Sequence, residues 1–382
     1  MLAPLDTSRR ASPAAGDAAL HRGDGAAGFA PIAPPESAPR RIAHLDLLRA
    51  AAILPVVAVN LVAQDVVDLG PWGNHVLESG WVGVDLFFVL SGWLIGGLYW
   101  REHARFGGVE VGRFWARRWL RTIPPYLAAL LAVGLATVVM GGDAPSWHYA
   151  VFAQNYLDPI PMWAVSWSLC VEEHFYLALP LVLGVALRVR WGVPLVLGAA
   201  VLLSLGARLL TVPDGAASWG VGYTATHLRL EGLALGVAAA AVRVRRPDVW
   251  PALRRGATWL ALPALAMVAS VPWMTADVVN QWAFLAVDVA FVVLLIAVVD
   301  RRALPLAASR VVRAVAFTSY SVYMTHTVVL NAYHRVAQDA VALPPAVHVA
   351  AALVCVAAVG GVFYVWVERP SVRLRDRWAP RR

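Results

Sequence analysis

Apolar stretches long enough to cross the hydrocarbon core of a bilayer recur along the chain from residue 44 onward. They lie near 44–64, 80–100, 121–141, 166–187, 192–212, 226–242, 257–274, 279–299, 311–333 and 346–367. The pattern predicts an all-α polytopic membrane protein, a bundle of about ten transmembrane helices of the length a bilayer requires. The sixth stretch is short, and Pro263 and Pro272 interrupt the seventh, which leaves the count open by one.

The two ends of the chain differ from the part between them. Residues 1–42 are rich in Ala, Pro and Gly and show no apolar period, so we expect a disordered cytoplasmic tail there. Residues 43–370 form the predicted transmembrane domain, which leaves no room for a separate soluble domain. Residues 371–382 are strongly basic and are expected to be a second cytoplasmic tail.

The composition excludes the ordinary soluble classes. Hydrophobic residues make up 59% of the chain and charged residues only 15%, whereas a soluble domain carries about a quarter. Cys170 and Cys355 lie far apart in apolar runs, so a disulfide framework and a cysteine metal cluster are excluded, and we expect no metal. The basic residues are all arginine, which with the many Ala, Gly and Pro is typical of a GC-rich bacterial genome. We therefore expect the bacterial inner membrane.

The arginines test the predicted topology, because cytoplasmic loops carry the excess of basic residues. Most of the 32 arginines lie in alternate loops and in both terminal segments, namely in 9–41, 101–121, 188–190, 243–255, 301–313 and 369–382. This alternation predicts that both termini are cytoplasmic. Topology thus explains the net charge of +8. The expected partner is the lipid bilayer, and nucleic-acid binding is excluded.

Several polar and charged residues fall inside the predicted spans, where an ionised group is costly and usually marks function. We favour a functional role for Glu172, Arg229 and His326 on this ground. For a single Ser, Asn or Tyr within a span, a hydrogen bond that holds two spans together is a better explanation than a catalytic or binding role. Asp46 and Glu173 stay open between the two readings, because either could lie near an interface.

The fourth span offers two neighbouring glutamates, of which the helical period selects one. Ser168, Glu172 and Tyr176 follow one another at intervals of four residues and share a helical face. Glu173 is rotated by about 100° from Glu172. We therefore expect Glu172 to point into the bundle and Glu173 to tolerate substitution better.

A cluster of arginines precedes the third span. Arg117 and Arg121 are four residues apart, and Arg118 and Arg121 three apart, so they can converge on one face of a helix. Guanidinium groups bind phosphates through paired hydrogen bonds. The alternative is an ordinary basic flank that contacts anionic lipid.

Six short segments of the chain, taken in order, resemble sequence motifs of the acyltransferase-3 family of integral-membrane O-acyltransferases. The segments are Leu45–Ala50, Gly83–Ile95, Arg117–Pro124, Trp167–Tyr176, Arg229–Gly236 and Tyr320–His326. The resemblance covers residues 44 to about 370. It implies transfer of an acyl group, commonly acetyl, from cytoplasmic acyl-CoA to a hydroxyl group of a glycan or a small natural product.

With this resemblance, the expected site residues fall into three groups. Catalytic roles are expected of Arg49, Asn60, Glu172 and His326. Arg117, Arg118 and Arg121 are expected to bind acyl-CoA. Contacts with the substrates are expected of Asp85, Ser91, Trp167, Ser168, Tyr176, Arg229, Glu231 and Tyr323.

The chain departs from the family pattern at one important position. In the first span, the family carries an arginine, then ten intervening residues, then a histidine to which catalysis is attributed, whereas here Asn60 takes that place after Arg49. Acyl transfer to an alcohol needs a general base, and a carboxamide cannot serve as one. Asn60 could still stabilise an oxyanion. His174, where the family usually has glutamine, is a second candidate base, although a packing role suits it equally well.

Two other functions stay open at this stage. A catalytically inactive relative that binds acyl-CoA or a glycan is supported by Asn60. A transporter could use the same charged interior as a substrate path, but the chain shows no clear internal repeat of the kind that many transporters have.

Overall fold

The computed structural model describes residues 43–212, 221–301, 305–338, 341 and 343–380, and these residues fold into helices without any strand. The helices are α1 (Ala43–Ala63), α2 (Gly70–Glu78), α3 (Val82–Phe106), α4 (Val111–Val139), α5 (Trp167–Ala186), α6 (Gly192–Thr211), α7 (Val221–Thr224), α8 (Glu231–Arg245), α9 (Trp250–Trp259), α10 (Ala261–Ala269), α11 (Ala276–Val278), α12 (Phe284–Val298), α13 (Arg310–Tyr333), α14 (Pro345–Phe363) and α15 (Arg369–Trp378). The expected tail at residues 1–42 lies outside the described residues.

Seven helical stretches among the described residues are long and apolar enough to cross a membrane, and they contain α1, α3, α4, α5, α6, α12 and α14. The all-α membrane architecture is therefore confirmed, whereas the predicted total of ten is not reached. The sixth predicted span corresponds to α8, which has only 15 residues. The seventh is divided between α9 and α10, and the ninth, α13, carries many polar side chains. The orientation of the termini stays a prediction.

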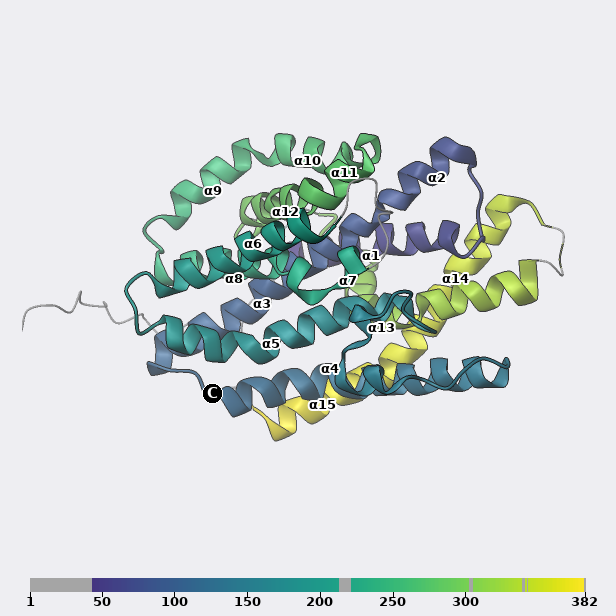
Figure 1. Cartoon of the computed structure of the whole chain (residues 1–382), viewed down its shortest axis with the longest axis horizontal. Coiled ribbons are helices and arrows are strands. Elements are labelled where there is room, and N and C mark those ends of the chain that lie inside the picture. The colour runs from purple at the N-terminus through teal and green to yellow at the C-terminus, as the bar shows by residue number, and fades with distance from the viewer. Residues whose placement is uncertain (1–42, 213–220, 302–304, 339–340, 342, 381–382) are drawn as a thin grey trace, which may run out of the picture. The chain divides into compact units, whose positions relative to one another are not determined.

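Helices α1 and α8 pack against α3 with almost no side chain between the backbones. A Cβ atom on Gly92 of α3 would lie 2.1 Å from the carbonyl oxygen of Leu233 in α8, and one on Gly236 would lie 2.3 Å from that of Val89. On the other side of α3, a Cβ on Gly83 would lie 2.3 Å from the Ala52 oxygen of α1. Only glycine permits such close approaches, so these residues hold α1, α3 and α8 together at the centre of the bundle (Figure 1).

The C-terminal helix α15 is part of the packed structure and not a free tail. It lies along α4 at the lower edge of Figure 1, while α9 and α10 lie along the upper edge. Arg117 of α4 donates a hydrogen bond to the carbonyl oxygen of Ala379 and pairs with Asp376 at 3.6 Å. The helical stretch of α14 continues through α15 and ends at Trp378, so the predicted boundary at residue 371 falls within α15.

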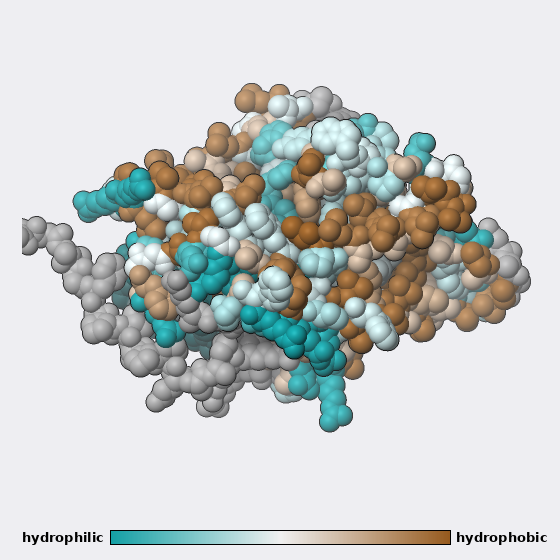
Figure 2. All heavy atoms as spheres, turned by 90° about the horizontal axis from the view of Figure 1, so that it is seen from below, coloured by the Kyte–Doolittle hydropathy of each residue, from teal (hydrophilic) through white to brown (hydrophobic). Residues whose placement is uncertain are grey.

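Large apolar side chains cover much of the surface. Leu210, Trp259 and Leu131 are among the most exposed, and Figure 2 shows apolar residues over wide parts of one face. A soluble monomer rarely exposes contiguous apolar area on this scale, because water would penalise it. The surface therefore fits an integral membrane protein.

Candidate functional site

Arg118 connects three helices in the interior of the bundle. Its Nη2 atom donates hydrogen bonds to Tyr176 Oη at 2.5 Å and to Glu172 Oε2 at 3.2 Å. The guanidinium carbon also lies 3.9 Å from the centre of the Tyr176 ring, at cation–π distance. Tyr176 Oη shares a further hydrogen bond with Ser91 of α3. The structure thus brings together four predicted site residues, and it assigns Arg118 a carboxylate partner within the protein.

Both glutamates of α5 are enclosed, contrary to the expectation that only Glu172 points inward. The side chain of Glu172 is 14% exposed and faces Arg118, while Glu173 is 8% exposed as a residue, with its Oε2 atom buried and without a hydrogen-bond partner among the described residues. Helix α5 has neighbours on several sides, including α3, α4 and α6, so two directions about 100° apart can both be interior. His174, the other candidate base on α5, hydrogen-bonds Thr226 Oγ1 at 2.8 Å.

His326 is the most enclosed candidate base. It is fully buried, and its Nδ1 atom contacts the carbonyl oxygens of Tyr323 at 2.8 Å and Val322 at 3.1 Å. Because a carbonyl oxygen can only accept, Nδ1 carries the proton in the neutral ring and Nε2 is the acceptor. Nε2 is buried and has no hydrogen-bond partner within the described part of the chain. The geometry leaves a proton-accepting nitrogen unused inside the protein.

Tyr323, one turn from His326, links α13 to the start of α5. Its hydroxyl group donates to the Val165 carbonyl oxygen at 2.9 Å and shares a hydrogen bond of 2.6 Å with Ser168. The ring packs edge-on against Phe87 of α3. Ser168 and Tyr323, both predicted to contact substrate, therefore bind each other in this structure and fix the position of α13 beside α5.

Asn60 lies level with His326 on the neighbouring helix. Asn331 of α13 donates a hydrogen bond of 3.0 Å to Gln64, the residue that directly follows α1. Asn60 precedes Gln64 by four residues and His326 precedes Asn331 by five, which correspond to about 6 and 7.5 Å along each axis. Both helices run the same way, because Glu368 binds Ser321, which precedes Asn331 in the chain, and interacts electrostatically with Arg49, which precedes Gln64.

The side chain of Asn60 uses only part of its hydrogen-bonding capacity. Its Nδ2 atom donates to the Val56 carbonyl oxygen of its own helix at 2.8 Å. Val56, Asn60 and Gln64 lie one turn apart and share a helical face, so Asn60 lies on the side of α1 that meets α13. The carboxamide has a second donor and an acceptor oxygen for other partners.

A basic cluster surrounds Arg121 at the opposite end of these helices. Arg121 is partly buried and makes no ion pair with a carboxylate of the described residues. Its charged neighbours include Arg49, Arg118 and Arg375, together with the acid Glu368. Glu368 is itself 3% exposed and accepts a hydrogen bond from Ser321. An excess of guanidinium groups in a partly buried position is suited to an anion with several charges, such as a pyrophosphate.

The three arginines predicted to bind acyl-CoA therefore have different surroundings. Arg121 faces the basic cluster, Arg118 binds Glu172 and Tyr176, and Arg117 is held by the C-terminal segment. The helical period turns Arg117 and Arg118 towards different neighbours of α4, while Arg118 stays near Arg121. That these three arginines bind acyl-CoA stays a prediction.

Three other predicted substrate contacts belong to a fully buried ion cluster. Arg229 pairs with Asp85 at 2.7 Å and Glu231 pairs with Arg208, all with side chains at most 1% exposed. The guanidinium of Arg229 also lies among aromatic rings, 3.9 Å from the centre of Phe284 and within cation–π range of Trp167, Phe88 and Tyr223. In this structure the cluster joins α3, α6, α8 and α12 and does not open to solvent.

Sequence reasoning missed two members of this cluster, Arg208 and Asp288. Asp288 is 2% exposed, and its Oδ1 atom lies 2.5 Å from the position that a Cβ atom on Gly232 would take. Arg208 is fully buried near the end of α6. Each stands as a single charged residue within an otherwise apolar stretch, and this isolation is the signal that could have identified them.

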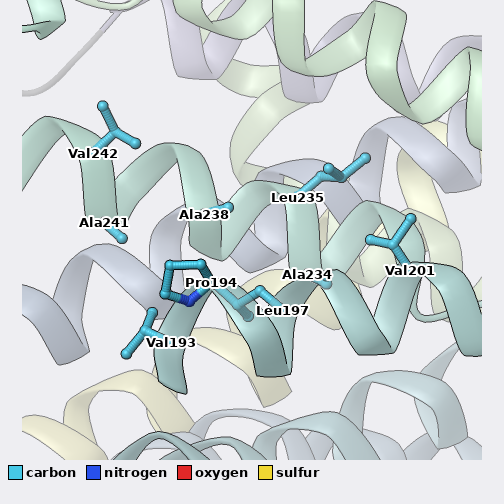
Figure 3. Close-up of a pocket in the computed structure, with 10 residues that line it drawn as sticks. Val193, Pro194, Leu197, Val201, Ala234, Leu235, Ala238, Ala241 and Val242 are labelled. Carbon is cyan, nitrogen blue, oxygen red and sulfur yellow. The ribbon is translucent and has the colours of Figure 1, made fainter. Parts of the chain in front are cut away.

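One groove in the structure contains none of the predicted site residues. It has a volume of about 350 Å³ and lies between α6 and α8, where small and branched apolar side chains line it (Figure 3). It contains no group that could take part in acyl transfer. The candidate reaction centre is therefore the interior region around His326, Asn60 and Arg118, with the basic cluster at one end.

The chain is similar to several known proteins. A family model described as an acyltransferase domain matches residues 42–367. A protein of Staphylococcus aureus strain COL, named provisionally as an O-acetyltransferase, is 30% identical over 218 residues, which cover 52% of this chain and 34% of that protein. The O-acetyltransferase OatA of Staphylococcus aureus strain NCTC 8325 is 33% identical over 162 residues, which cover 38% of this chain and 25% of OatA.

These matches span about a third or less of the length of the curated relatives. No solved structure matches the chain significantly. The family model, in contrast, extends from the start of α1 to the end of the last apolar stretch and includes all six segments on which the sequence resemblance rests. The chain therefore belongs to the acyltransferase-3 family.

Proposed function

We propose that this protein is an O-acetyltransferase of the bacterial inner membrane. The acyl donor is cytoplasmic acetyl-CoA, and the acceptor is a hydroxyl group of an exported glycan or of a small molecule. Family membership and the names of the relatives support the acetyl transfer. The single structural observation that carries the proposal is the buried and unpartnered Nε2 atom of His326, because transfer to an alcohol requires a group that removes the hydroxyl proton.

His326 then takes the role that the family assigns to the position of Asn60. Its Nδ1–H is fixed by two backbone carbonyl oxygens, which hold the ring in one tautomer and leave Nε2 ready to accept a proton. Nε2 removes the proton of the acceptor hydroxyl while the hydroxyl oxygen bonds to the acyl carbon. As the bond between the acyl carbon and the sulfur breaks, the same nitrogen returns the proton to the leaving sulfur.

Asn60 is suited to position the reactants. Its free amide N–H and its oxygen lie at the level of His326, and an amide N–H can stabilise negative charge that develops on the acyl oxygen. Such a role needs no proton transfer by the carboxamide. With His326 as the base and Asn60 as the group that stabilises charge, a chain with asparagine at this position can still support general-base catalysis.

The basic cluster is suited to hold the phosphates of the donor. Tyr320 Oη donates to the Thr122 carbonyl oxygen at 3.1 Å, which places Arg121 near the level of Tyr320. Tyr320 precedes His326 by six residues, or about 9 Å along α13. The pantetheine arm of CoA is long enough to connect phosphates bound at Arg121 with a thioester near His326. Arg49, which the resemblance assigns to catalysis, belongs to this donor end and pairs with Asp46 at 3.9 Å.

Turnover of radiolabelled acetyl-CoA by the purified, reconstituted protein tests the proposal. We expect label to move to a hydroxyl acceptor, and His326→Gln to abolish this transfer while the protein still binds the donor. Binding of acetyl-CoA without transfer by either form would instead favour an inactive relative, the alternative that Asn60 supports. Accumulation of unmodified substrate inside vesicles would favour a transporter.

A further inference from the structure

The groove between α6 and α8 combines an apolar body with one strongly basic end. Its walls are entirely hydrocarbon, from Val193 and Pro194 at one end to Val201 and Ala234 at the other (Figure 3). Pro194 to Val201 spans seven residues, or about 10 Å, most of the hydrocarbon depth of one leaflet in a bilayer whose core is about 30 Å thick. The groove therefore has the length and polarity to accept a hydrocarbon chain.

The basic end is formed by residues that continue the two walls. Arg188 and Arg190 precede α6, and Arg245 follows Val242 by three residues, on the face of α8 that also carries Ala238 and Ala241. All three arginines are exposed. Along the chain, Arg190 is three residues before Val193 at the end of one wall, and Arg245 is three residues after Val242 at the end of the other.

These three arginines are not neutralised by the protein. Arg190 and Arg245 face the rings of Trp191 and Trp100, and neither they nor Arg188 form an ion pair with a carboxylate of the described residues. The acids at this end are engaged elsewhere: Asp248 pairs with Arg246, and Asp300 pairs with Arg243. A guanidinium packed on a ring still has N–H groups for a phosphate.

We propose that this groove is a binding site for an anionic phospholipid, with one acyl chain between α6 and α8 and the phosphate held by Arg190 and Arg245. Basic pockets between transmembrane helices are known to bind such headgroups. The charge at one end favours a phospholipid over a helix from another protein, because a helix would leave the arginines without partners. The predicted topology places the site in the cytoplasmic leaflet, on the side where the donor is expected.

The chain offers matched variants to test this site. Gly198 lies in the groove wall, and a Cβ there would meet nothing within 4 Å, so Gly198→Leu fills the groove without a clash at Cβ. Gly206 on the same helix is equally open but does not line the groove, so Gly206→Leu is the control. Arg190→Gln with Arg245→Gln removes the headgroup contacts. Arg254→Gln with Arg255→Gln makes the same change of charge on α9.

The measurement is native mass spectrometry together with thermal unfolding in nanodiscs of phosphatidylcholine, with and without phosphatidylglycerol. We expect one phosphatidylglycerol to be retained by the parent and by both controls, with a rise in Tm. Gly198→Leu and the Arg190/Arg245 variant should retain it at least tenfold more weakly and lose most of that rise, since each arginine contributes to binding an anionic lipid.

Three results would overturn the proposal. Equal retention by Gly198→Leu and Gly206→Leu would show that the chain does not lie in the groove. An equal rise in Tm with inorganic phosphate alone would show an anion site without a lipid. A change in oligomeric mass in Gly198→Leu, with lipid retention unchanged, would identify a protein helix as the occupant.

Discussion

Asn331 binds Gln64 across the contact between α13 and α1, and this hydrogen bond sets His326 level with Asn60. Asn60, which stands where the family carries its histidine, and the buried imidazole of His326 therefore lie at the same level along the bundle axis. Two substitutions examine whether they serve the same reacting hydroxyl group.

His326→Gln should lower the rate of acyl transfer about 10²–10⁴-fold, the usual contribution of general-base assistance. Glutamine keeps a donor for the carbonyl oxygens of Tyr323 and Val322 but has no basic nitrogen, so we expect Tm to change little. The matched control is His174→Gln, because His174 hydrogen-bonds Thr226 and is not needed as a base. If His174→Gln were the inactive variant, the base would lie on α5.

Asn60→His introduced into His326→Gln should restore at least a tenth of the parent rate. The new imidazole would occupy the level of the lost one, on the face of α1 that meets α13. The restored rate should rise with pH as the imidazole loses its proton, because only the neutral ring accepts a proton. Leu54→His in the same background places a histidine on an exposed side of α1 and should restore nothing. No recovery with Asn60→His would mean that Asn60 does not reach the acceptor.

Arg121→Ala should raise the Kd for acetyl-CoA at least about tenfold, or ~1.4 kcal/mol. Arg121 makes no ion pair with a carboxylate of the described residues, and Glu368 nearby keeps its hydrogen bond from Ser321 and its interaction with Arg49, so the substitution mainly removes a phosphate contact. Titration by calorimetry measures the change, and Arg105→Ala, at an exposed position near the end of α3, is the control. Unchanged affinity in Arg121→Ala would place the donor elsewhere.

Glu172→Gln should reduce activity strongly, and Glu173→Gln should be better tolerated, although both side chains are enclosed. Glu172 is the carboxylate that Arg118 contacts, whereas the buried oxygen of Glu173 has no hydrogen-bond partner in the described structure. A double-mutant cycle with Arg118→Gln measures the coupling, since residues in one pair show non-additive effects. Additive losses would show that the contact between Arg118 and Glu172 does not carry the function.

Asp85→Asn should destabilise the protein much more than Asp288→Asn. Removing one partner of a buried ion pair costs about 3–5 kcal/mol, because the remaining charge is left uncompensated. Asp85 neutralises Arg229 at 2.7 Å, whereas Asp288 is the third acid beside two guanidinium groups and has no ion pair within the described residues. Thermal unfolding in detergent compares the two. Equal losses would mean that Asp288 is also needed as an anion.

The sequence was sufficient to locate the elements that lie along single apolar stretches. The predicted stretches 44–64, 166–187 and 192–212 agree with α1, α5 and α6 to within one residue at each end. Hydropathy identifies such helices because burial in lipid acts on each segment alone. In the seventh stretch, Pro263 lies in the first turn of α10 and Pro272 follows the end of that helix, while the division from α9 falls at Leu260.

The partners of the polar side chains could not be predicted in the same way. The spacing of residues on one helix places Glu172 and Tyr176 together, but it does not reveal that Arg118 of α4 lies opposite them. Arg208 and Glu231 pair only because α6 and α8 are neighbours. Which helices become neighbours depends on how small residues such as Gly92 let backbones approach, and this is a property of the whole bundle.

The contact between α3 and α8 limits how this protein can move. With Gly92 and Gly236 facing backbone atoms of the other helix, any sliding or separation of these helices would bring a carbonyl oxygen into collision or open a void. The pair must therefore act as one rigid body. Hinge motions that admit donor or acceptor have to occur in the helices around it, and a channel that opened between α3 and α8 is not available to the acyl group.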